Sequence, residues 1–435
     1  MTPAARISAA IEVVADIAAR RRPAGDALKD WGLSHRFAGS GDRAAIAGLV
    51  YDALRRRSSS AWIMGDDAPR SNLLGMLRLE RGLDVEAIAA LCDGAGHAPS
   101  PLSAEERTRL AGATLEGAPM PVAGDYPDWL DGHFARTFGD DRGAALAALA
   151  RRAPLDVRVN ALKGGREQAA AALSDVNPSP TRWSPVGLRI ELAPEARSPA
   201  LHAEPAFLKG LIEIQDEGSQ LAVLLSGARP GEQVVDLCAG GGGKTLGLAA
   251  QMENHGQIYA TDSDKRRLAP IHARLERAGA RNVQVRTPRG GKDTLADLAA
   301  GADLVLIDAP CTGTGVWRRN PDAKWRIRPG ALAERQKEQV EVLARAAPLV
   351  KPGGRIAYVT CSVLEEENGA QVRDFLARHA DFAVVPTDRV AEALGERAFL
   401  FRRAVTMSAE GILMTPLLTG TDGFYVAVLA RARGV

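Results

Sequence analysis

The stretch Val234-Val-Asp-Leu-Cys-Ala-Gly-Gly-Gly-Gly-Lys-Thr245 joins a short apolar run to a loop of four glycines. The apolar run predicts a buried strand, and the glycines predict a loop that opens a helix. Further apolar runs of strand length, each followed by a helical stretch, lie at residues 258–260, 283–285, 304–307 and 356–359. Short buried strands alternating with helices are typical of a parallel sheet covered on both faces. We therefore predict a doubly wound α/β domain.

The bulk properties indicate a multidomain protein that does not enter a membrane. At 435 residues the chain exceeds the ~100 to 200 residues of a usual single domain, so we expect two or three domains. It contains 46% hydrophobic and 25% charged residues and no apolar run of the ~18 residues that a membrane span needs. Glu12 and Asp16 interrupt the N-terminal stretch where an export signal would be apolar. We expect a cytoplasmic protein.

The spacing of the cysteines and the net charge indicate which kinds of site the chain can contain. Cys92, Cys238, Cys311 and Cys361 lie far apart, without CxxC motifs or zinc-type pairing with histidine. This spacing favours reduced thiols and no structural metal. The formal net charge of +2 neither requires nor excludes nucleic acid, so contacts to phosphate would depend on local basic patches.

The N-terminal region is predicted to be helical. Apolar residues recur at helical spacing within 7–17, 46–54, 73–79 and 85–91. Ser103 and Glu106 form a capping-box signature. These features predict an all-α domain over residues 1–120.

A turn-rich stretch at 121–127 ends this region, and the pattern then changes. Alternating apolar residues predict strands at 155–159 and 188–192, with a helix between them at 165–174. We predict a connector and a small α+β subdomain over residues 121–210, followed by the α/β domain over 211–435.

The glycine loop and Asp262 together indicate a nucleoside cofactor. Backbone N–H groups of such a loop can approach a ligand in the crevice where open α/β sheets bind ligands. The loop is neither GxGxxG nor a full P-loop, because Cys238 and Ala239 precede its glycines. Asp262, at the end of the second predicted strand, can accept both hydroxyls of a ribose. On this pattern alone, a plain turn with Asp262 capping the next helix fits equally well.

A more specific pattern comes from Asp308-Ala-Pro-Cys311 and Thr360-Cys361-Ser362. Each cysteine follows a predicted strand on the ligand side of the sheet, where the two thiols can converge. A thiolate that adds to carbon 6 of a cytosine activates carbon 5 to accept a methyl group, and a carboxyl such as Asp308 can assist at N3. A second thiol, or a base acting with it, suits the loss of the carbon-5 proton and of the enzyme thiol. An isolated cysteine is more often a small buried hydrophobe, the role we expect for Cys92 and Cys238.

These cysteine motifs resemble those of the RsmB/Sun and Nop family of RNA cytosine-5 methyltransferases. The resemblance extends over residues 211–431 and includes Ile214-Gln-Asp-Glu-Gly-Ser-Gln220. It implies a Rossmann-like class I methyltransferase fold with S-adenosylmethionine as cofactor. It also implies that Cys361 is the nucleophile, that Cys311 assists product release and that Asp308 lies near base and cofactor. The residues implied to hold the cofactor are Cys238, Ala239, Gly240, Gly241, Gly242, Gly243, Lys244, Asp262 and Asp308.

Two departures from the family pattern stand out. The usual Cys-Ala-Ala-Pro-Gly-Gly-Lys reads Cys238-Ala-Gly-Gly-Gly-Gly-Lys244 here, which adds backbone freedom. An acid expected after the third strand is absent around residues 285–288, which removes an expected contact on the adenine side, and Asp293 lies too far along to replace it.

Residues 1–120 resemble the NusB-like RNA-binding module of bacterial RsmB proteins, and residues 155–210, with Arg158-Val-Asn160, resemble the small subdomain before the family's catalytic domain. The resemblance implies ribosomal RNA as the substrate; we expect a monomer.

Basic residues suggest where RNA would lie. A run interpreted as an RNA-facing loop mixes basic and aromatic side chains: Trp317, Arg318, Arg319, Lys324, Trp325, Arg326 and Arg328. Residues 20–22 and 55–57 either add such contacts or solvate helix ends.

Three alternatives remain open at this point. The altered glycine loop and the missing acid also fit an RNA-binding ribosome-assembly factor with a degenerate methyltransferase domain. A transfer RNA cytosine-5 methyltransferase would carry the same motifs. The same fold can also act on DNA or protein. Paired cysteines argue against protein, and the type of motif argues against DNA.

Overall fold

The computed structural model describes residues 1–193, 197–288, 290 and 294–434. The chain divides into two compact units. Unit 1 contains Met1–Arg152 and Trp317–Arg328, and unit 2 contains Ala153–Leu192, Ser198–Val316 and the chain from Pro329 onward.

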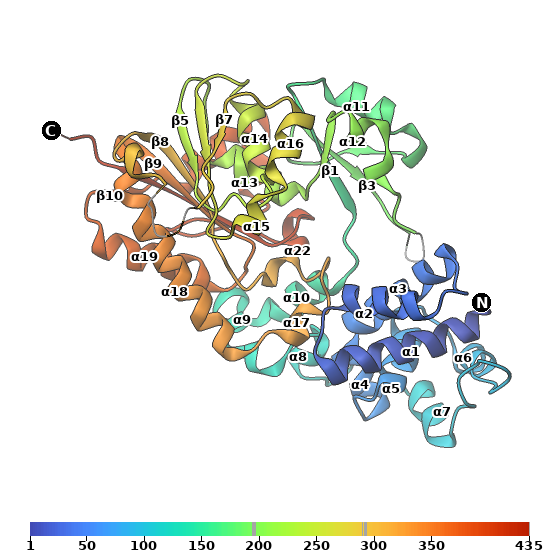
Figure 1. Ribbon diagram of the computed structural model, residues 1–435. Coiled ribbons are helices and arrows are strands. Elements are labelled where there is room, and N and C mark those ends of the chain that lie inside the picture. Colours follow the sequence, from blue (N-terminus) through green and yellow to red (C-terminus); the bar gives the residue numbers. More distant parts are fainter. Residues whose placement is uncertain (194–196, 289, 291–293, 435) are drawn as a thin grey trace. The chain divides into compact units, whose positions relative to one another are not determined.

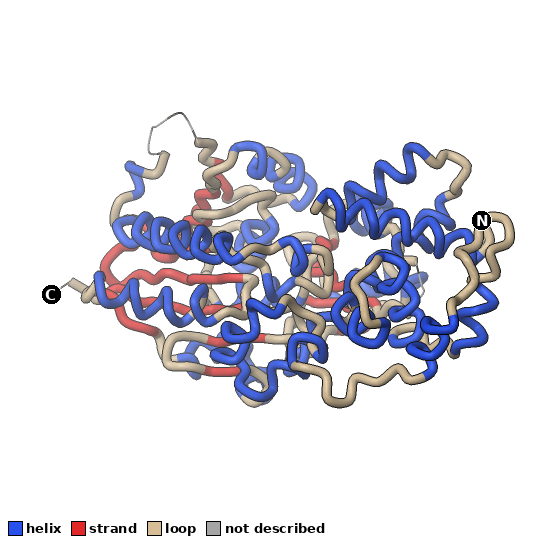
Figure 2. Tube along the Cα trace, turned by 90° about the horizontal axis from the view of Figure 1, so that it is seen from below, coloured by secondary structure: helices blue, strands red, loops and turns tan. Residues whose placement is uncertain are grey.

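Unit 1 is helical. Residues 1–152, all of them described, contain helices and loops but no strand (Figure 2). The helices are α1 (Pro3–Arg20), α2 (Ala24–Ser34), α3 (Ser40–Arg55), α4 (Arg57–Met64), α5 (Pro69–Leu79), α6 (Val85–Leu91), α7 (Ala104–Ala111), α8 (Met120–Ala123), α9 (Asp131–Phe138), α10 (Arg142–Ala150) and α17 (Ala323–Arg326). The predicted capping box is confirmed, since Ser103 Oγ accepts from the Glu106 N–H and the Glu106 carboxylate accepts from the Ser103 N–H. Cys92 is buried among the apolar residues of this unit, as expected.

A segment far along the chain, Trp317–Arg328, completes unit 1. Trp317 is 2% exposed, and its ring lies edge-on to Phe134 with 5.7 Å between ring centroids. The indole N–H of Trp325 donates a hydrogen bond to the carbonyl oxygen of Leu54 at 2.6 Å. Both tryptophans therefore fix this segment to the helices of unit 1.

Lys324 in the same segment is a buried amine with two carbonyl partners. Its side chain is 1% exposed, and Nζ donates to the carbonyl oxygens of Arg55 and Asp125 at 2.9 and 2.6 Å. Burial lowers the pKa of Lys324 to about 7.

The interpretation of this run as an RNA-facing loop is therefore wrong for Trp317, Arg318 and Lys324, which are all buried. Arg55 is buried as well and donates to the carbonyl oxygen of Arg318 at 2.9 Å. A mixture of cations and rings also suits a segment that docks on helices, because long basic side chains bury their stems. Arg328, by contrast, is exposed.

The other predicted basic runs contain ion pairs. Arg20 lies 2.9 Å from Asp16, one helical turn away, and Arg57 donates to Asp67 at 2.9 Å. These contacts favour the interpretation of both runs as helix ends.

Unit 2 contains a small antiparallel sheet in the order β2-β3-β1-β4. Its elements are β1 (Leu155–Val159), β2 (Ser179–Pro180), β3 (Gly187–Ile190) and β4 (Ile212–Ile214), with helices α11 (Arg166–Ala172) and α12 (Pro205–Leu208). The strands and helix expected here are present. The predicted border at 210/211 is wrong, however, because it separates β4 from β1, with which β4 pairs through Val157 and Ile214.

The large sheet of unit 2 has five parallel strands in the order β9-β8-β5-β6-β7. These are β5 (Gln233–Asp236), β6 (Gln257–Ala260), β7 (Val283–Val285), β8 (Ala302–Asp308) and β9 (Val350–Thr360). All five predicted strands are confirmed. The sheet is nevertheless mixed, because an antiparallel extension follows β9. It consists of β10 (Phe382–Val384), β11 (Thr406–Met407), β12 (Ile412–Met414) and β13 (Phe424–Arg431). In this extension β13 pairs with β9, β10 and β12 pair with β13, and β11 pairs with β12.

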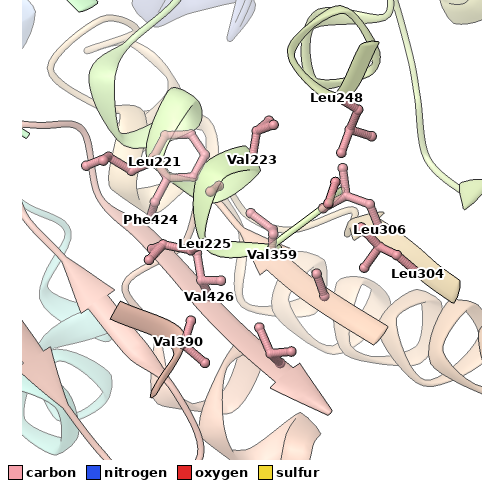
Figure 3. Packing of buried hydrophobic residues seen from close by; sticks show 14 of the residues in the cluster. Leu221, Val223, Leu225, Leu248, Leu304, Leu306, Val359, Val390, Phe424 and Val426 are labelled. Atoms are coloured by element: carbon pink, nitrogen blue, oxygen red, sulfur yellow. The ribbon is translucent and has the colours of Figure 1, made fainter. Parts of the chain in front are cut away.

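Helices cover both faces of this sheet (Figure 1). The α-helices of unit 2 that follow β4 are α13 (Glu217–Leu225), α14 (Gly243–Gln251), α15 (Lys265–Leu268), α16 (Ile271–Ala278), α18 (Pro329–Ala346), α19 (Gly369–Arg378), α20 (Thr387–Ala391), α21 (Ala398–Arg402) and α22 (Pro416–Thr419). Figure 3 shows Leu304 and Leu306 of β8 packed in one cluster with Leu248 of α14 and Val359 of β9. Successive β8 residues are fully buried on both faces, which explains why their sequence is continuously apolar.

No helix in the described part of the chain is both long and apolar enough to span a bilayer. Within those same residues, no group of three or more His, Cys, Asp or Glu side chains is arranged to hold a metal ion.

Two glycines meet where β13 begins. Gly315 donates its N–H to the carbonyl oxygen of Cys361 at 2.9 Å, and Gly423 donates to the carbonyl oxygen of Gly315 at 2.8 Å. A Cβ on Gly315 would lie 2.1 Å from the carbonyl oxygen of Gly423. Only glycine allows the loop that follows Cys311 to approach the start of β13 this closely.

Gly315→Ala is therefore expected to lower the free energy of unfolding by about 1–3 kcal/mol, because the backbone must move to admit the methyl group. Urea denaturation measures the change. The matched control is Gly330→Ala in α18, where a Cβ meets nothing within 4 Å. Equal stability of the two variants would contradict the close approach.

Candidate active site

The two cysteine motifs converge at the carboxyl ends of β8 and β9. The strands pair in parallel with Asp308 opposite Val359, so both chains leave the sheet at the same edge. The Sγ atoms of Cys311 and Cys361 lie 3.4 Å apart. Thr314 and Ser362 add a hydroxyl contact at 3.0 Å between the two loops. The structure thus brings together the thiols that the sequence places 50 residues apart.

The surroundings of Cys311 favour the protonated form of its thiol. Its pKa is raised well above the usual value by the hydrogen bond with Cys361, by burial and by the nearby Glu367 carboxylate. Either sulfur can donate in the contact between the two thiols, and the raised pKa of Cys311 favours Cys311 as the donor.

The glycine loop needs glycine at two positions. Gly240 and Gly242 have φ values of 50° and 84°, in the left-handed region. A Cβ on Gly242 would also lie 2.5 Å from Ile271. The loop then leads directly into α14, so its backbone N–H groups lie at a helix N-terminus.

Asp262 organises this loop. Its Oδ2 accepts from the Gly240 N–H and its Oδ1 from the Asp264 N–H, each at 2.9 Å. The alternative that Asp262 merely caps the next helix is wrong, because Asp264 caps α15 through the N–H of Arg266. Asp262 therefore lies beside the glycine loop, and its contact with the hydroxyls of a ribose stays a prediction.

Asp236 is a site residue that the sequence prediction missed. It ends β5, is fully buried, and its Oδ2 accepts from the Thr245 hydroxyl at 2.7 Å. Its Oδ1 has no partner in the described chain. Burial, followed by the charge of Asp308, raises the pKa of Asp236 to about 7. An unpartnered buried acceptor beside the loop fits a cofactor with ammonium and hydroxyl donors, as S-adenosylmethionine has.

Lys244 connects the glycine loop to the first cysteine motif. Its Nζ lies 2.7 Å from Asp308 Oδ2 and 5.2 Å from the centre of the Phe424 ring. Lys244 is buried, whereas the Asp308 side chain is 36% exposed. The carboxyl predicted to assist the base is thus one partner of an ion pair.

The surroundings of Cys238 disfavour its thiolate form. Burial and the neighbouring Asp236 and Asp308 carboxylates raise the pKa of its thiol. Its predicted role, a small side chain whose backbone lines the loop, matches this environment.

Arg286 follows β7 at the place where the family acid was expected. It forms an ion pair with Asp297 at 2.9 Å, and its guanidinium lies 5.1 Å from the centre of the Tyr259 ring. Asp293 lies outside the described residues.

Arg158 of the small sheet supports the glycine loop where α14 begins. Its Nη1 donates to Gln215 Oε1 at 2.5 Å and to the Gly243 carbonyl oxygen at 2.9 Å. Burial lowers its pKa to about 10. The sequence indicated it only through Arg158-Val-Asn160, which resembles the family's small subdomain, because the alternating pattern of the strand places Arg158 at a polar position.

Comparison with known proteins identifies the family. The family described as 16S rRNA methyltransferase RsmB/F matches residues 223–430, and the ferredoxin-like domain of RsmF/B-like methyltransferases matches residues 126–196. The chain is 33% identical over 310 residues to the probable ribosomal RNA small subunit methyltransferase B of Synechocystis sp., covering 71% of this chain and 67% of that relative. The chain belongs to the RsmB/F family of methyltransferases.

A second relative is the ribosomal RNA small subunit methyltransferase B of Erwinia tasmaniensis, 33% identical over 70% of this chain and 66% of its own length. The alignments thus span about two thirds of these relatives.

Solved structures share the fold. The crystal structure of PH0851 matches with a TM-score of 0.69 and 26% identity over 99% of both chains. A methyltransferase homologue from Pyrococcus horikoshii matches with a TM-score of 0.56 and 26% identity over 72% of this chain and 97% of its own. NSun6 of the same organism, solved with the cofactor analogue SFG, matches at a TM-score of 0.56 and 20% identity over 71% of this chain and 99% of its own. The RsmB/F chain is a methyltransferase with a Rossmann-like fold and a helical N-terminal region.

The raised pKa of Cys311 predicts selective alkylation. With limiting iodoacetamide at pH 7.5, Cys311 and Cys238 are expected to react far more slowly than Cys361, because only the thiolate is nucleophilic. Peptide mass spectrometry after quenching measures the order of labelling. Labelling of Cys311 before Cys361 would show that the surroundings of Cys311 do not favour its protonated thiol.

Asp236 predicts a pH dependence of stability. Its pKa is about 7 in the folded protein against the ordinary aspartate value of 3.8 in an unfolded chain, so between these values only the folded state binds the proton. Stability must therefore fall as pH rises through this window. Urea unfolding should show that wild type loses roughly 2–4 kcal/mol more than Asp236→Asn between pH 4.5 and pH 7.5. If the free energies of unfolding of wild type and Asp236→Asn change equally with pH, Asp236 does not bind this proton in the folded state.

Proposed function

We propose that this protein methylates carbon 5 of a cytosine in ribosomal RNA of the small subunit, with Cys361 as the nucleophile. The observation that carries the proposal is the 3.4 Å contact between Cys361 and Cys311 beside the cofactor loop. Methyl transfer to an amine or hydroxyl needs no thiol, whereas carbon 5 of cytosine needs covalent activation. The names of the relatives support ribosomal RNA as the substrate.

The first step is attack. The Cys361 thiolate forms a bond to carbon 6, and the ring electrons shift so that carbon 5 becomes nucleophilic and N3 gains negative charge. The Cys311 S–H stabilises the thiolate before attack through its hydrogen bond. Asp308, held by Lys244 at the same edge, is positioned to orient the base at its N3 side. S-adenosylmethionine supplies an electrophilic methyl group.

The second step is release. Carbon 5 now bears both a methyl group and a proton; a base takes the proton, and the electron pair of that C–H bond re-forms the ring double bond as the C6–S bond breaks. The Cys361 sulfur leaves with its electron pair. Cys311, protonated and in contact with that sulfur, lowers the barrier by donating a hydrogen bond to the departing thiolate.

The remaining parts take supporting roles in this proposal. Residues 1–120 form a NusB-like RNA-binding domain, residues 121–214 a connector and a small subdomain that includes β4, and the residues after β4 the catalytic domain. The enzyme acts as a cytoplasmic monomer without a metal.

Substitutions of the two cysteines are expected to affect different steps of the reaction. Cys361→Ser is expected to lose transfer by about 100-fold or more, because a hydroxyl is a far weaker nucleophile than a thiolate. Cys311→Ala is expected to trap a covalent protein–RNA adduct. Labelled S-adenosylmethionine, bacterial RNA lacking its own cytosine methylation and denaturing gels measure both effects.

Cys92→Ala is the matched control, because Cys92 lies in the helical unit. Wild-type transfer by Cys361→Ser would overturn the nucleophile. Neither label nor adduct with wild type and Cys311→Ala would favour the RNA-binding assembly factor instead.

A further inference from the structure

Glu367 is a fully buried carboxylate at the end of the short helix η8 (Glu365–Glu367), and its side chain has hydrogen-bond partners beside both cysteines, Thr312 next to Cys311 and Ser362 next to Cys361. Its Oε1 accepts from the Thr312 N–H at 2.8 Å and from Gln339 Nε2 at 3.1 Å. Its Oε2 accepts from the Thr312 hydroxyl at 2.5 Å. A buried carboxylate is costly unless its lone pairs are filled, so these donors hold Thr312 in place.

Glu367 also acts on the residue before Cys311. Gln339, fully buried on α18, donates from the same Nε2 to the carbonyl oxygen of Pro310 at 2.9 Å. The backbone is therefore held on both sides of the thiol, at Thr312 directly and at Pro310 through Gln339.

Asn368, the next residue, holds the other cysteine in the same manner. Its Oδ1 accepts from the Thr360 hydroxyl at 2.5 Å, and its Nδ2 donates to the carbonyl oxygen of Ser362 at 2.9 Å. Both ends of the amide are used, so the side chain cannot turn without losing a bond. Cys361 lies between the two residues that Asn368 holds.

The sheet fixes the position of the pair. The Tyr358 hydroxyl donates to the carbonyl oxygen of Glu367 at 2.7 Å, and Tyr358 is a buried residue of β9. Glu367 and Asn368 are consecutive, so a single peptide unit connects the groups that hold Cys311 to those that hold Cys361.

From this geometry we propose that Glu367 and Asn368 are positioning residues that set the distance between the two sulfurs, Glu367 governing the release step and Asn368 the attack step. This inference rests on the proposed function. Neither side chain contacts the reacting base in this account; each acts through a cysteine.

The negative charge of Glu367 also favours the protonated form of Cys311. It helps to raise the pKa of Cys311 and so keeps that thiol a donor. Removing the charge weakens both the position and the protonation of Cys311, and neither change alters the nucleophile itself.

The test compares Glu367→Gln and Asn368→Asp with the control Glu365→Gln, in the full-length protein. Glu365 lies in the same helix η8 but pairs at the surface with Arg373. Glu367→Gln is expected to raise the fraction of trapped protein–RNA adduct about fivefold or more, with single-turnover attack near the wild-type rate. Asn368→Asp is expected to slow single-turnover methyl transfer about tenfold or more without trapping adduct. Thermal melting checks that each variant is folded.

A second readout needs neither RNA nor cofactor. Diamide takes up two hydrogens as adjacent thiols form a disulfide, and peptide mass spectrometry follows the Cys311–Cys361 disulfide. Both positioning variants are expected to form it more slowly than wild type, and Glu365→Gln at the wild-type rate. If Glu367→Gln does not fold, Thr312→Val removes one donor to Glu367 at nearly constant shape and should shift both readouts in the same direction.

The outcomes separate the two proposals. If folded Glu367→Gln and Asn368→Asp match Glu365→Gln in oxidation rate and in adduct fraction, the positioning role is overturned. If Cys311→Ala also traps no adduct, the proposed function fails, and the oxidation rates still decide whether the pair sets the sulfur distance.

Discussion

The chemistry of this protein depends on the parallel pairing of β8 with β9. Because neighbouring parallel strands end at one edge, Cys311 and Cys361 meet there although 50 residues separate them. The contact with Cys361, burial and the Glu367 carboxylate raise the pKa of Cys311, which favours the protonated form of that thiol. In the proposed steps, the two cysteines therefore take different roles without a histidine or a metal.

The cofactor side is built on the same edge, from β5 and β6. Carboxylates gather there, Lys244 lies among them as the partner of Asp308, and Arg267 lies 3.9 Å from Asp262. This arrangement explains why Asp236 holds a proton near neutral pH: a buried carboxylate beside another carboxylate is costly to ionise. A cofactor with a positive charge suits such a site, and the glycine loop leaves room for its approach.

Sequence patterns predicted the features of the structure that depend on residues close together in the chain. The five parallel strands, the capping box at Ser103 and the two cysteine motifs follow from short-range periodicity and from where strands end. The rest depends on partners distant in sequence. The sequence of β13 is an apolar run like many others, and its antiparallel pairing with β9 is visible only in the structure. From sequence alone Lys324 is expected to be an exposed cation, whereas in the structure it donates to the carbonyl oxygens of Arg55 and Asp125. Glu367 lies in a run of three acids, of which it is the fully buried member, and only its donors distinguish it.

The central claim is that the Cys361 sulfur forms the bond to the base. The most direct measurement is to digest the complex of Cys311→Ala with methylated RNA, using protease and nuclease, and to locate the nucleotide by mass spectrometry. The account predicts a methylated cytidine nucleotide attached to the peptide that contains Cys361. A nucleotide found on Cys238 or on any other residue would contradict it.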